Sequence, residues 1–311
     1  MNLILKAVIG ILLFPVAAFA VGTVVNTCVR IKNKSLLRKP LGQFLQIDGH
    51  TMNVLVKGQG SHTLVFLSGL GTTSPVLDFK ALYSRLEDEF RIVVPEKFGY
   101  GFSDIAKTPR SFADNVELYR RCLSMLGIKG PYILCAHSIS GLEAMLWAQR
   151  YPQEVEAIVG LDTTPADFTD GKTEKTPGPW RVMQIKALNL CGLSRFAKPK
   201  CLPHLTEEEK RVIQELSVRN NLNNSIVSEF RDIPNIGETV RSGALPTQPC
   251  IHFIAQRDPS ITWTEQWREC HQEYADASAD GKLIQLNCGH YVHNFEHRKI
   301  AEEIRELSKR L

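Results

Sequence analysis

Residues 132–141 place a serine between small side chains, at the point where an apolar run gives way to a helical pattern. A serine hydroxyl becomes a nucleophile only when a base takes its proton and the backbone presents it away from its neighbours. A tight strand-to-helix turn does this, and it requires small residues two positions before and after the serine. Around Ser138 these are Ala136 and Ser140, where glycine is usual, and Gly141 follows. The pattern indicates a nucleophile, and a buried serine at a strand end is the alternative.

Two further polar residues complete a possible catalytic set. Asp258 and His290 each follow a later apolar run of the chain. Catalytic groups gather outside the carboxyl ends of the strands in an open parallel sheet, and the order serine, aspartate, histidine is typical of one class of serine hydrolase. Ser138 would attack an acyl carbon, His290 would take its proton, and Asp258 would orient the imidazole. Asp162 also ends an apolar run and is the alternative acid.

The elements that position these residues alternate along most of the chain. Apolar runs followed by helical patterns predict a mostly parallel central sheet with helices on both faces. We expect a helical cap over residues 165–247, where no strand pattern occurs, between the core segments 41–164 and 248–311. Asp48-Gly49 predicts a hairpin turn between the first two strands. The predicted strands are 44–47, 52–57, 63–67, 91–95, 132–136, 155–161, 251–255 and 282–286, and the predicted helices include 75–87, 112–126, 180–190, 206–218, 225–231, 262–274 and 294–311.

Five short segments in this order resemble motifs of the α/β-hydrolase superfamily. The resemblance covers nearly all of residues 42–311 and is strongest to bacterial membrane-anchored members with a short helical cap. It implies an α/β-hydrolase fold with a nucleophilic serine. The segments are Phe66-Leu-Ser-Gly-Leu-Gly71, Glu96-Lys-Phe-Gly-Tyr-Gly-Phe-Ser-Asp104, Ala136-His-Ser-Ile-Ser-Gly141, Gln256-Arg-Asp258 and Cys288-Gly-His-Tyr-Val-His293.

The resemblance also implies where the negative oxygen of the reaction intermediate would bind. The backbone amides of Leu70 and Ile139 are the implied oxyanion donors. Glycines let the backbone approach a substrate closely, so Gly69, Gly71 and Gly141 are expected to support the site.

The same resemblance predicts hydrolysis of carboxylic esters through an acyl-enzyme, with a small-molecule acyl ester as the substrate and no cofactor. A serine nucleophile excludes the epoxide hydrolase and dehalogenase branches, which use an aspartate at this position. One alternative is an amidase or a peptidase similar to prolyl aminopeptidase. The other is a non-catalytic ligand-binding protein of the same fold, which the departures from glycine at Ala136 and Ser140 motivate.

Several histidines lie close together in the sequence near the predicted base. His290, His293 and His297 could be read as metal ligands, but no carboxylate or cysteine accompanies them in a ligand pattern. We therefore expect no metal. His137, next to the nucleophile, is predicted to be a packing residue, and Glu96 is predicted to form structural hydrogen bonds.

The N-terminal segment, residues 1–40, has a composition unlike the rest of the chain. The net charge of the whole chain is +4. Six of the 37 basic residues precede Asp48, and no acidic residue does, so the chain from Asp48 onward has fewer basic residues than its 33 acidic ones. No nucleic-acid surface is expected. Ala7 to Val25 carries no charge and is long enough to span a membrane. A single-pass anchor is favoured because basic residues follow directly, and a signal peptide cleaved near Ala20 is the alternative.

The chain has eight cysteines without a CxxC pair or regular spacing, and we expect them to be reduced residues of the core. The sequence leaves the membrane topology and the oligomeric state open.

Overall fold

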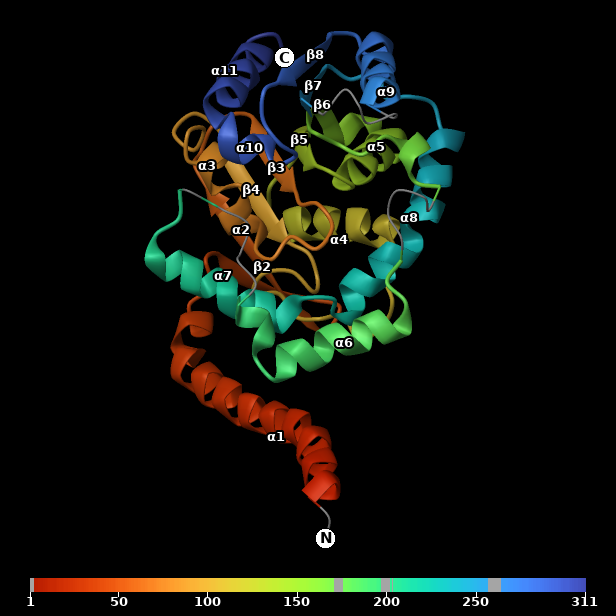
Figure 1. The fold of residues 1–311 in the computed structure, drawn as a ribbon. Coiled ribbons are helices and arrows are strands. Elements are labelled where there is room, and N and C mark those ends of the chain that lie inside the picture. The colour runs from red at the N-terminus through yellow and green to blue at the C-terminus, as the bar shows by residue number, and fades with distance from the viewer. Residues whose placement is uncertain (1–2, 171–175, 197–201, 203, 257–263) are drawn as a thin grey trace.

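An eight-stranded sheet forms the centre of the protein in the computed structural model (Figure 1). The structure describes residues 3–170, 176–196, 202, 204–256 and 264–311, with side chains from residue 13 onward. The strand order is β1-β2-β4-β3-β5-β6-β7-β8, in which β1–β2 and β2–β4 are antiparallel and the other pairs parallel. The strands are β1 Gln43–Ile47, β2 His50–Lys57, β3 Thr63–Leu67, β4 Arg91–Glu96, β5 Tyr132–His137, β6 Val155–Leu161, β7 Cys250–Ala255 and β8 Gly281–Leu286. The predicted mostly parallel sheet is confirmed.

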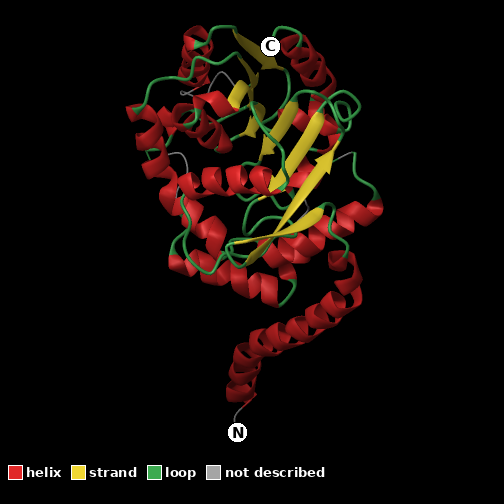
Figure 2. Cartoon of the chain, turned by 180° about the vertical axis from the view of Figure 1, so that it is seen from behind, coloured by secondary structure: helices red, strands yellow, loops and turns green. Residues whose placement is uncertain are grey.

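Helices cover both faces of this sheet (Figure 2). Alternate residues of β3 point to opposite faces: Val65 and Leu67 pack with α4 and α5, whereas Leu64 and Phe66 pack with α3 and α11. The helices are α1 Leu3–Lys32, α2 Pro75–Asp78, α3 Lys80–Tyr83, α4 Phe112–Met125, α5 Ser140–Arg150, α6 Pro179–Leu190, α7 Glu207–Asn220, α8 Asn224–Ser242, α9 Thr264–Ala277, α10 Val292–Phe295 and α11 His297–Ser308, with 3-10 turns η1 Asn33–Arg38, η2 Pro152–Glu154, η3 Ala166–Phe168 and η4 Leu193–Phe196.

The predicted hairpin at the edge of the sheet is confirmed. Asp48 and Gly49 connect β1 to β2 with φ angles of 52° and 72°. Two consecutive positive φ values match the twist that a two-residue hairpin turn needs, and Asp-Gly tolerates them. This turn fixes the register of the antiparallel edge.

Three helices differ from their predicted extents, and the one predicted over 294–311 is two helices, α10 and α11, which are separated at Glu296. The single helix predicted over 75–87 is two short helices, because the chain turns at Phe79, whose ring packs between Phe66 at 5.1 Å and His293 at 4.8 Å. The helix predicted over 225–231 continues as α8 to Ser242, through Pro234. Its second half is amphipathic and buries apolar side chains in the core, and this burial offsets the cost of a proline within a helix.

The segment predicted as a cap contains the helices α6, α7 and α8. Helices α6 and α7 lie between α1 and the sheet, whereas α8 runs along one side of the molecule (Figure 1). No strand occurs in its described residues, 165–170, 176–196, 202 and 204–247. The exact boundaries of the cap and of the two core segments remain predictions.

Helix α1 extends away from the rest of the molecule (Figure 1). Among the described residues, one stretch, Leu13–Arg38, contains an 18-residue window apolar enough to cross a membrane, with a mean hydropathy of 1.5 and 6% of its residues buried. These properties are consistent with a single-pass anchor or a signal sequence.

The described cysteines are all free thiols. Five of them are buried, as expected for reduced core residues, whereas Cys28 in α1 is exposed and Cys288 is half-buried. Cys201 lies outside the described residues.

Candidate active site

The turn between β5 and α5, called the elbow below, holds Ser138 in a left-handed conformation. Its φ angle is 58°, a value that a non-glycine residue adopts only at some cost in conformational energy. Close contacts leave no room for larger neighbours: a Cβ on Gly69 would lie 2.9 Å from Ser138 Cβ, and a Cβ on Gly141 would lie 2.5 Å from Thr163 Cβ. The turn therefore has the sharp geometry that presents a serine hydroxyl, as the small residues around it predict.

Ser140 stands where glycine is usual, and the structure gives a physical reason. Its hydroxyl lies 2.7 Å from the carbonyl oxygen of Leu67 at the end of β3, and it accepts a hydrogen bond from the backbone N–H of His137 at 3.0 Å. The side chain is fully buried. The hydroxyl thus links the start of α5 to the ends of two neighbouring strands.

His290 lies beside Ser138, in the loop between β8 and α10. Its Nε2 is 3.0 Å from Ser138 Oγ. The ring is about one-third exposed. With Nδ1 protonated, Nε2 has a free lone pair that faces the hydroxyl, so it can accept the proton of Ser138. The structure brings together the two residues that the sequence assigned as nucleophile and base.

The carboxylate against His290 is that of Asp162, which the sequence offered as the alternative acid. Asp162 Oδ2 lies 2.6 Å from His290 Nδ1, and Oδ1 accepts a hydrogen bond from the Ala255 N–H at 3.0 Å. Asp162 directly follows β6, has a φ of 49°, and is fully buried. Asp258, the first choice from the sequence, lies outside the described residues.

The two backbone amides implied as oxyanion donors are those of Leu70, after β3, and Ile139, at the start of α5. Neither N–H takes part in a hydrogen bond between described residues. The first amides of a helix have no partner within it, so the Ile139 N–H can donate to an oxyanion. Gly71, next to Leu70, has a φ of 70° and donates its own N–H to the Tyr100 hydroxyl at 3.0 Å.

Tyr100 connects this loop to a buried cluster of charges that sequence reasoning missed. Its hydroxyl donates to Glu229 of α8, and Lys97 Nζ lies 3.1 Å from Glu229 and 3.3 Å from Glu143 of α5. All four side chains are buried. Asn115 of α4 donates to both carboxylates, at 2.8 and 2.9 Å.

Two carboxylates face one ammonium group in this cluster. Burial raises the pKa of Glu143 to about 7, and the nearby negative charge of Glu229 acts in the same direction, while Lys97 opposes both. The cluster stabilises the approach of α8 to the core, because separating these groups would leave charges buried without partners. The residues come from four separate parts of the fold, so no local sequence pattern predicts the cluster.

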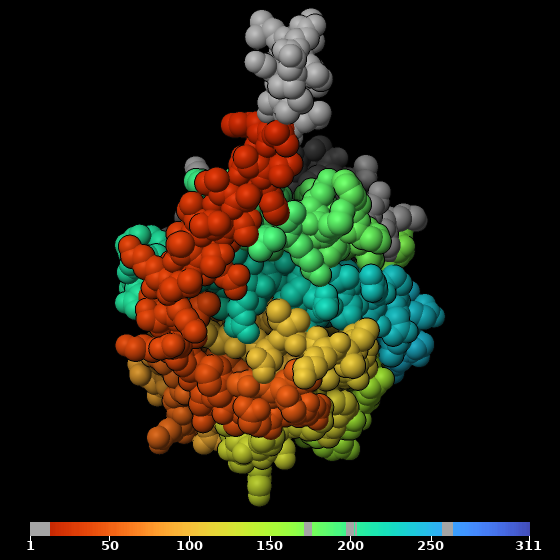
Figure 3. Space-filling view, turned by 90° about the horizontal axis from the view of Figure 1, so that it is seen from below, coloured from red at the N-terminus to blue at the C-terminus, as the bar shows by residue number. Residues whose placement is uncertain are grey.

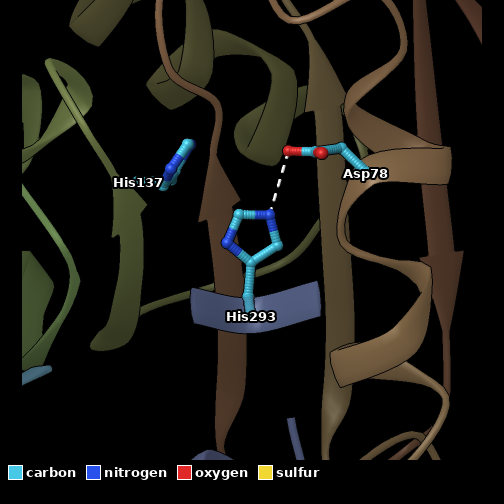
Figure 4. A group of neighbouring side chains, drawn as sticks. All are labelled: Asp78, His137 and His293. Atoms are coloured by element: carbon cyan, nitrogen blue, oxygen red, sulfur yellow. Dashed lines mark hydrogen bonds and ion pairs between the residues drawn. The ribbon is translucent and has the colours of Figure 1, made fainter. Parts of the chain in front are cut away.

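Next to His290 lies a second group of polar side chains, Asp78, His137 and His293 (Figure 4). His293 Nε2 is 3.0 Å from Asp78 Oδ2, and Asn294 donates to Asp78 Oδ1 at 3.3 Å. The candidate ligand atoms of the three residues lie within 4.8 Å of one another, and all three residues are buried. This donor set suits a metal such as zinc, but both Asp78 oxygens already accept hydrogen bonds.

His137 has a more specific place than the packing role predicted for it. Its Nε2 lies 3.2 Å from the carbonyl oxygen of His290, and the two rings are 4.7 Å apart. His137 therefore connects the end of β5 to the loop that carries the base. His297 does not belong to this group. Its Nδ1 accepts a hydrogen bond from Arg85 Nε at 2.7 Å.

Glu96 forms the structural hydrogen bonds predicted for it. It accepts from the Phe102 N–H at 2.7 Å, from Asn53 Nδ2 at 2.9 Å and from the Ser74 hydroxyl at 2.9 Å. Burial nevertheless raises the pKa of this carboxyl.

Comparisons with known proteins place the chain in a family. The family described as alpha/beta hydrolase fold matches residues 62–181, which include the Leu70 loop, the elbow and Asp162. YbdG of Bacillus subtilis (strain 168) is 29% identical over 91% of this chain and 90% of its own length. YqjL of the same organism is 30% identical over 80% of this chain and 85% of its own length. The chain is an α/β-hydrolase.

A putative epoxide hydrolase from Pseudomonas aeruginosa has a similar structure. It superimposes on this α/β-hydrolase with a TM-score of 0.66 at 17% identity. The match covers 85% of this chain and 93% of the other. At this identity the likeness shows the fold alone. The chemistry of this α/β-hydrolase depends on the residues around Ser138.

Proposed function

We propose that this protein is a serine hydrolase that cleaves carboxylic esters through an acyl-enzyme. The observation that carries the proposal is the chain of contacts from Ser138 Oγ to His290 Nε2 at 3.0 Å and from His290 Nδ1 to Asp162 Oδ2 at 2.6 Å, with Ser138 at a φ of 58°. A serine, a base and an orienting acid in this sequence of contacts are the elements of nucleophilic catalysis.

The first half of the reaction transfers the acyl group to the enzyme. Ser138 Oγ attacks the ester carbonyl carbon while His290 Nε2 takes the hydroxyl proton, and Asp162 stabilises the imidazolium that forms. The N–H groups of Leu70 and Ile139 donate to the oxyanion of the tetrahedral intermediate. When the intermediate collapses, the bond to the alcohol breaks, and His290 returns the proton to the leaving oxygen.

The second half repeats these steps with water. His290 accepts a proton from a water molecule, the resulting hydroxide attacks the acyl carbon, and Ser138 leaves with the proton that His290 holds. The products are a carboxylic acid and the restored enzyme: the alcohol leaves with the proton of the Ser138 hydroxyl, and the attacking water replaces that proton through His290. No cofactor is required for this cycle.

The departures from glycine that motivated a non-catalytic function have a structural explanation. Ser140 forms hydrogen bonds with the ends of β3 and β5. Ala136 is fully buried, and Ser138 remains in contact with His290. Both residues therefore support an intact elbow. An amidase or peptidase function is the alternative that the experiment below distinguishes from ester cleavage.

Hydrolysis of p-nitrophenyl butyrate tests the proposal. The Ser138→Ala variant should lose nearly all activity, whereas Ser124→Ala, an exposed serine on α4, should retain the wild-type rate. Wild-type activity in Ser138→Ala would contradict the proposal. The corresponding p-nitroanilide tests the bond type, because an amidase or peptidase would cleave the anilide at a measurable rate that is lost in Ser138→Ala, whereas an esterase would leave it intact.

The N-terminal helix extends the proposal to localisation. We expect α1 to remain attached as a single-pass anchor, with basic residues following the apolar stretch, rather than to be removed near Ala20. The mass of the protein isolated from membranes distinguishes the two, because cleavage removes the first 20 residues.

A further inference from the structure

The end of helix α6 in the cap lies against α1 (Figure 3). Asn26 Nδ2 donates to the carbonyl oxygens of Asn189 and Leu190, at 2.9 and 3.0 Å. Asn26 directly follows residues 7–25 of α1, and the first charged residue after them is Arg30. If α1 spans a membrane, as proposed above, this contact holds the end of α6 at the membrane surface.

Polar side chains fix this arrangement. Arg195 Nε donates to Asn26 Oδ1 at 2.7 Å, and the Arg195 guanidinium pairs with Glu215 of α7 through contacts of 2.5 and 2.8 Å. Asn33, after α1, donates to the same carboxylate at 2.6 Å. Asn26 and Glu215 are buried, so α1 and the cap form a connected unit.

The cap next to α1 exposes large apolar side chains. Side chains of this kind insert into the boundary between headgroups and acyl chains, and tryptophan is enriched at that depth. A row of them on one cap segment beside an apolar helix matches a membrane surface better than open water. They are Trp180, 68% exposed, Met183, 52%, Leu190, 49%, Leu193, 55%, and Phe196, 83%.

Beside these side chains, two cavities of about 360 and 540 Å³ share Lys186 and Asn224 and together form one groove along α6. The smaller cavity faces the end of α1, and the larger one has an apolar wall formed by Val182, Met183 and Val227. No aspartate or glutamate occurs among the residues that line either cavity, but five cationic residues do: Arg30, Lys107, Lys186, Arg219 and Arg231.

Most of these cations have no anionic partner. Within the described part of the chain, none of Arg30, Lys107, Lys186 and Arg231 lies within ion-pair distance of a carboxylate, although the charge of Arg30 helps to lower the pKa of Glu215. Lys186 donates to Asn224 Oδ1 at 3.4 Å, and Arg219 donates to the carbonyl oxygen of Ser103 at 2.9 Å. Unpaired cations that line a shared groove attract an anion, and guanidinium and ammonium groups both bind phosphate oxygens. Asn221 and Asn224 of the smaller cavity add hydrogen-bond donors, because their side-chain N–H groups donate to no described residue, whereas those of Asn223 donate to the Gly99 and Asn220 carbonyl oxygens.

We propose that this groove, defined as the two cavities along α6, binds the phosphate of an anionic phospholipid from the membrane that holds α1. The phosphate lies between Arg30 and Lys186, and the lipid's apolar part lies against Val182 and Met183. A lipid fits better than a free anion because cations, an apolar wall and the membrane-proximal end of α1 meet at one place. The site is separate from Ser138, so it does not depend on ester cleavage.

Native mass spectrometry of the full-length chain in a neutral detergent tests the site. The probe is an ether-linked phosphatidylglycerol, which has no ester for a hydrolase to cleave, and ether-linked phosphatidylcholine with the same chains is the zwitterionic comparison. We expect one phosphatidylglycerol to bind in preference to phosphatidylcholine. Lys186→Gln should weaken this binding about fivefold, and Arg30→Gln combined with it about 25-fold, since each cation near a membrane surface contributes about 1 kcal/mol.

The matched control is Lys129→Gln, which removes an exposed charge outside the groove and should leave binding unchanged. Thermal unfolding by circular dichroism shows that each variant is folded. Equal phosphatidylglycerol binding by the wild type and the Arg30/Lys186 double variant would overturn the site. Full displacement of the lipid by inorganic phosphate would overturn the lipid as its ligand. Loss of esterase activity with lipid binding intact would concern the proposed function alone.

Discussion

Asp162 Oδ2 lies 2.6 Å from Nδ1 of His290, at the end of β6 rather than in the segment that follows β7. The strand β6 is the direct neighbour of β5 in the sheet, so Asp162 and Ser138 leave adjacent strands on either side of the imidazole. A second contact, from the Ala255 N–H to Asp162 Oδ1 at 3.0 Å, holds the carboxylate in place. This geometry favours Asp162 as the acid that orients His290.

Asparagine substitutions distinguish the two candidate acids. Asp162→Asn should lower kcat for an ester by a factor on the order of 10⁴, because an amide facing Nδ1 stabilises the wrong tautomer of His290. Asp258→Asn should change kcat by less than about tenfold. Steady-state kinetics with p-nitrophenyl butyrate measure both. The reverse pattern would make Asp258 the acid and leave Asp162 a structural residue.

Gly69 is expected to be intolerant of any side chain. A Cβ there would lie 2.9 Å from Ser138 Cβ and 3.0 Å from His137 Nδ1, so Gly69→Ala should displace the nucleophile. A displacement of about 1 Å typically costs about 100-fold in rate, and we expect a loss of this size in kcat. Gly178→Ala is the matched control because its Cβ would meet no atom within 4 Å. Equal kinetics for the two variants would refute the steric argument.

Restoring the usual glycine at position 140 should weaken the protein. Ser140→Gly removes a buried hydroxyl that contacts the Leu67 carbonyl at 2.7 Å and accepts from the His137 N–H at 3.0 Å. We expect the free energy of unfolding to fall by about 1–3 kcal/mol, since these backbone groups lose a partner. Urea denaturation measures the change. Unaltered stability would mean that the hydroxyl contributes nothing to the elbow.

The buried cluster around Lys97 predicts a dependence of stability on pH. Burial raises the pKa of Glu143 from 4.5 to about 7 in the folded protein. Between these values the folded chain binds more protons than the unfolded chain, so this group's contribution to stability is present below about pH 4.5 and is lost as the pH rises through about 7. The melting temperature of Glu143→Gln should fall less over this window than that of the wild type.

A matched control separates this effect from general titration. Glu302→Gln removes an exposed carboxylate of α11 and should keep the wild-type slope of melting temperature against pH. If Glu143→Gln and the wild type have parallel profiles, Glu143 does not titrate in this range.

The sequence predicted the elements of the sheet and the position of Ser138 and His290, because strand ends, small residues and the Asp48-Gly49 turn are local signals. The choice between Asp162 and Asp258 was harder, since both follow apolar runs and only the three-dimensional arrangement shows which carboxylate meets Nδ1. The link from His137 to the His290 carbonyl was missed for the same reason.

The buried charges show a further limit. Lys97, Glu143 and Glu229 are far apart in the sequence, and from the sequence each would be expected at the surface. All three are buried. Their burial follows from the packing of α8 against α4 and α5, which no local pattern specifies. Likewise, the groove along α6 arises only where the cap meets the end of α1.

The central claim, that Ser138 is a nucleophile activated by His290, is tested most directly by covalent labelling. A fluorophosphonate probe reacts with an activated serine hydroxyl, and mass spectrometry of the digested protein locates the adduct. We predict one adduct on Ser138 in the folded wild-type protein, and loss of that adduct in His290→Ala and after denaturation. A folded wild-type protein that acquires no adduct on Ser138 would contradict the account.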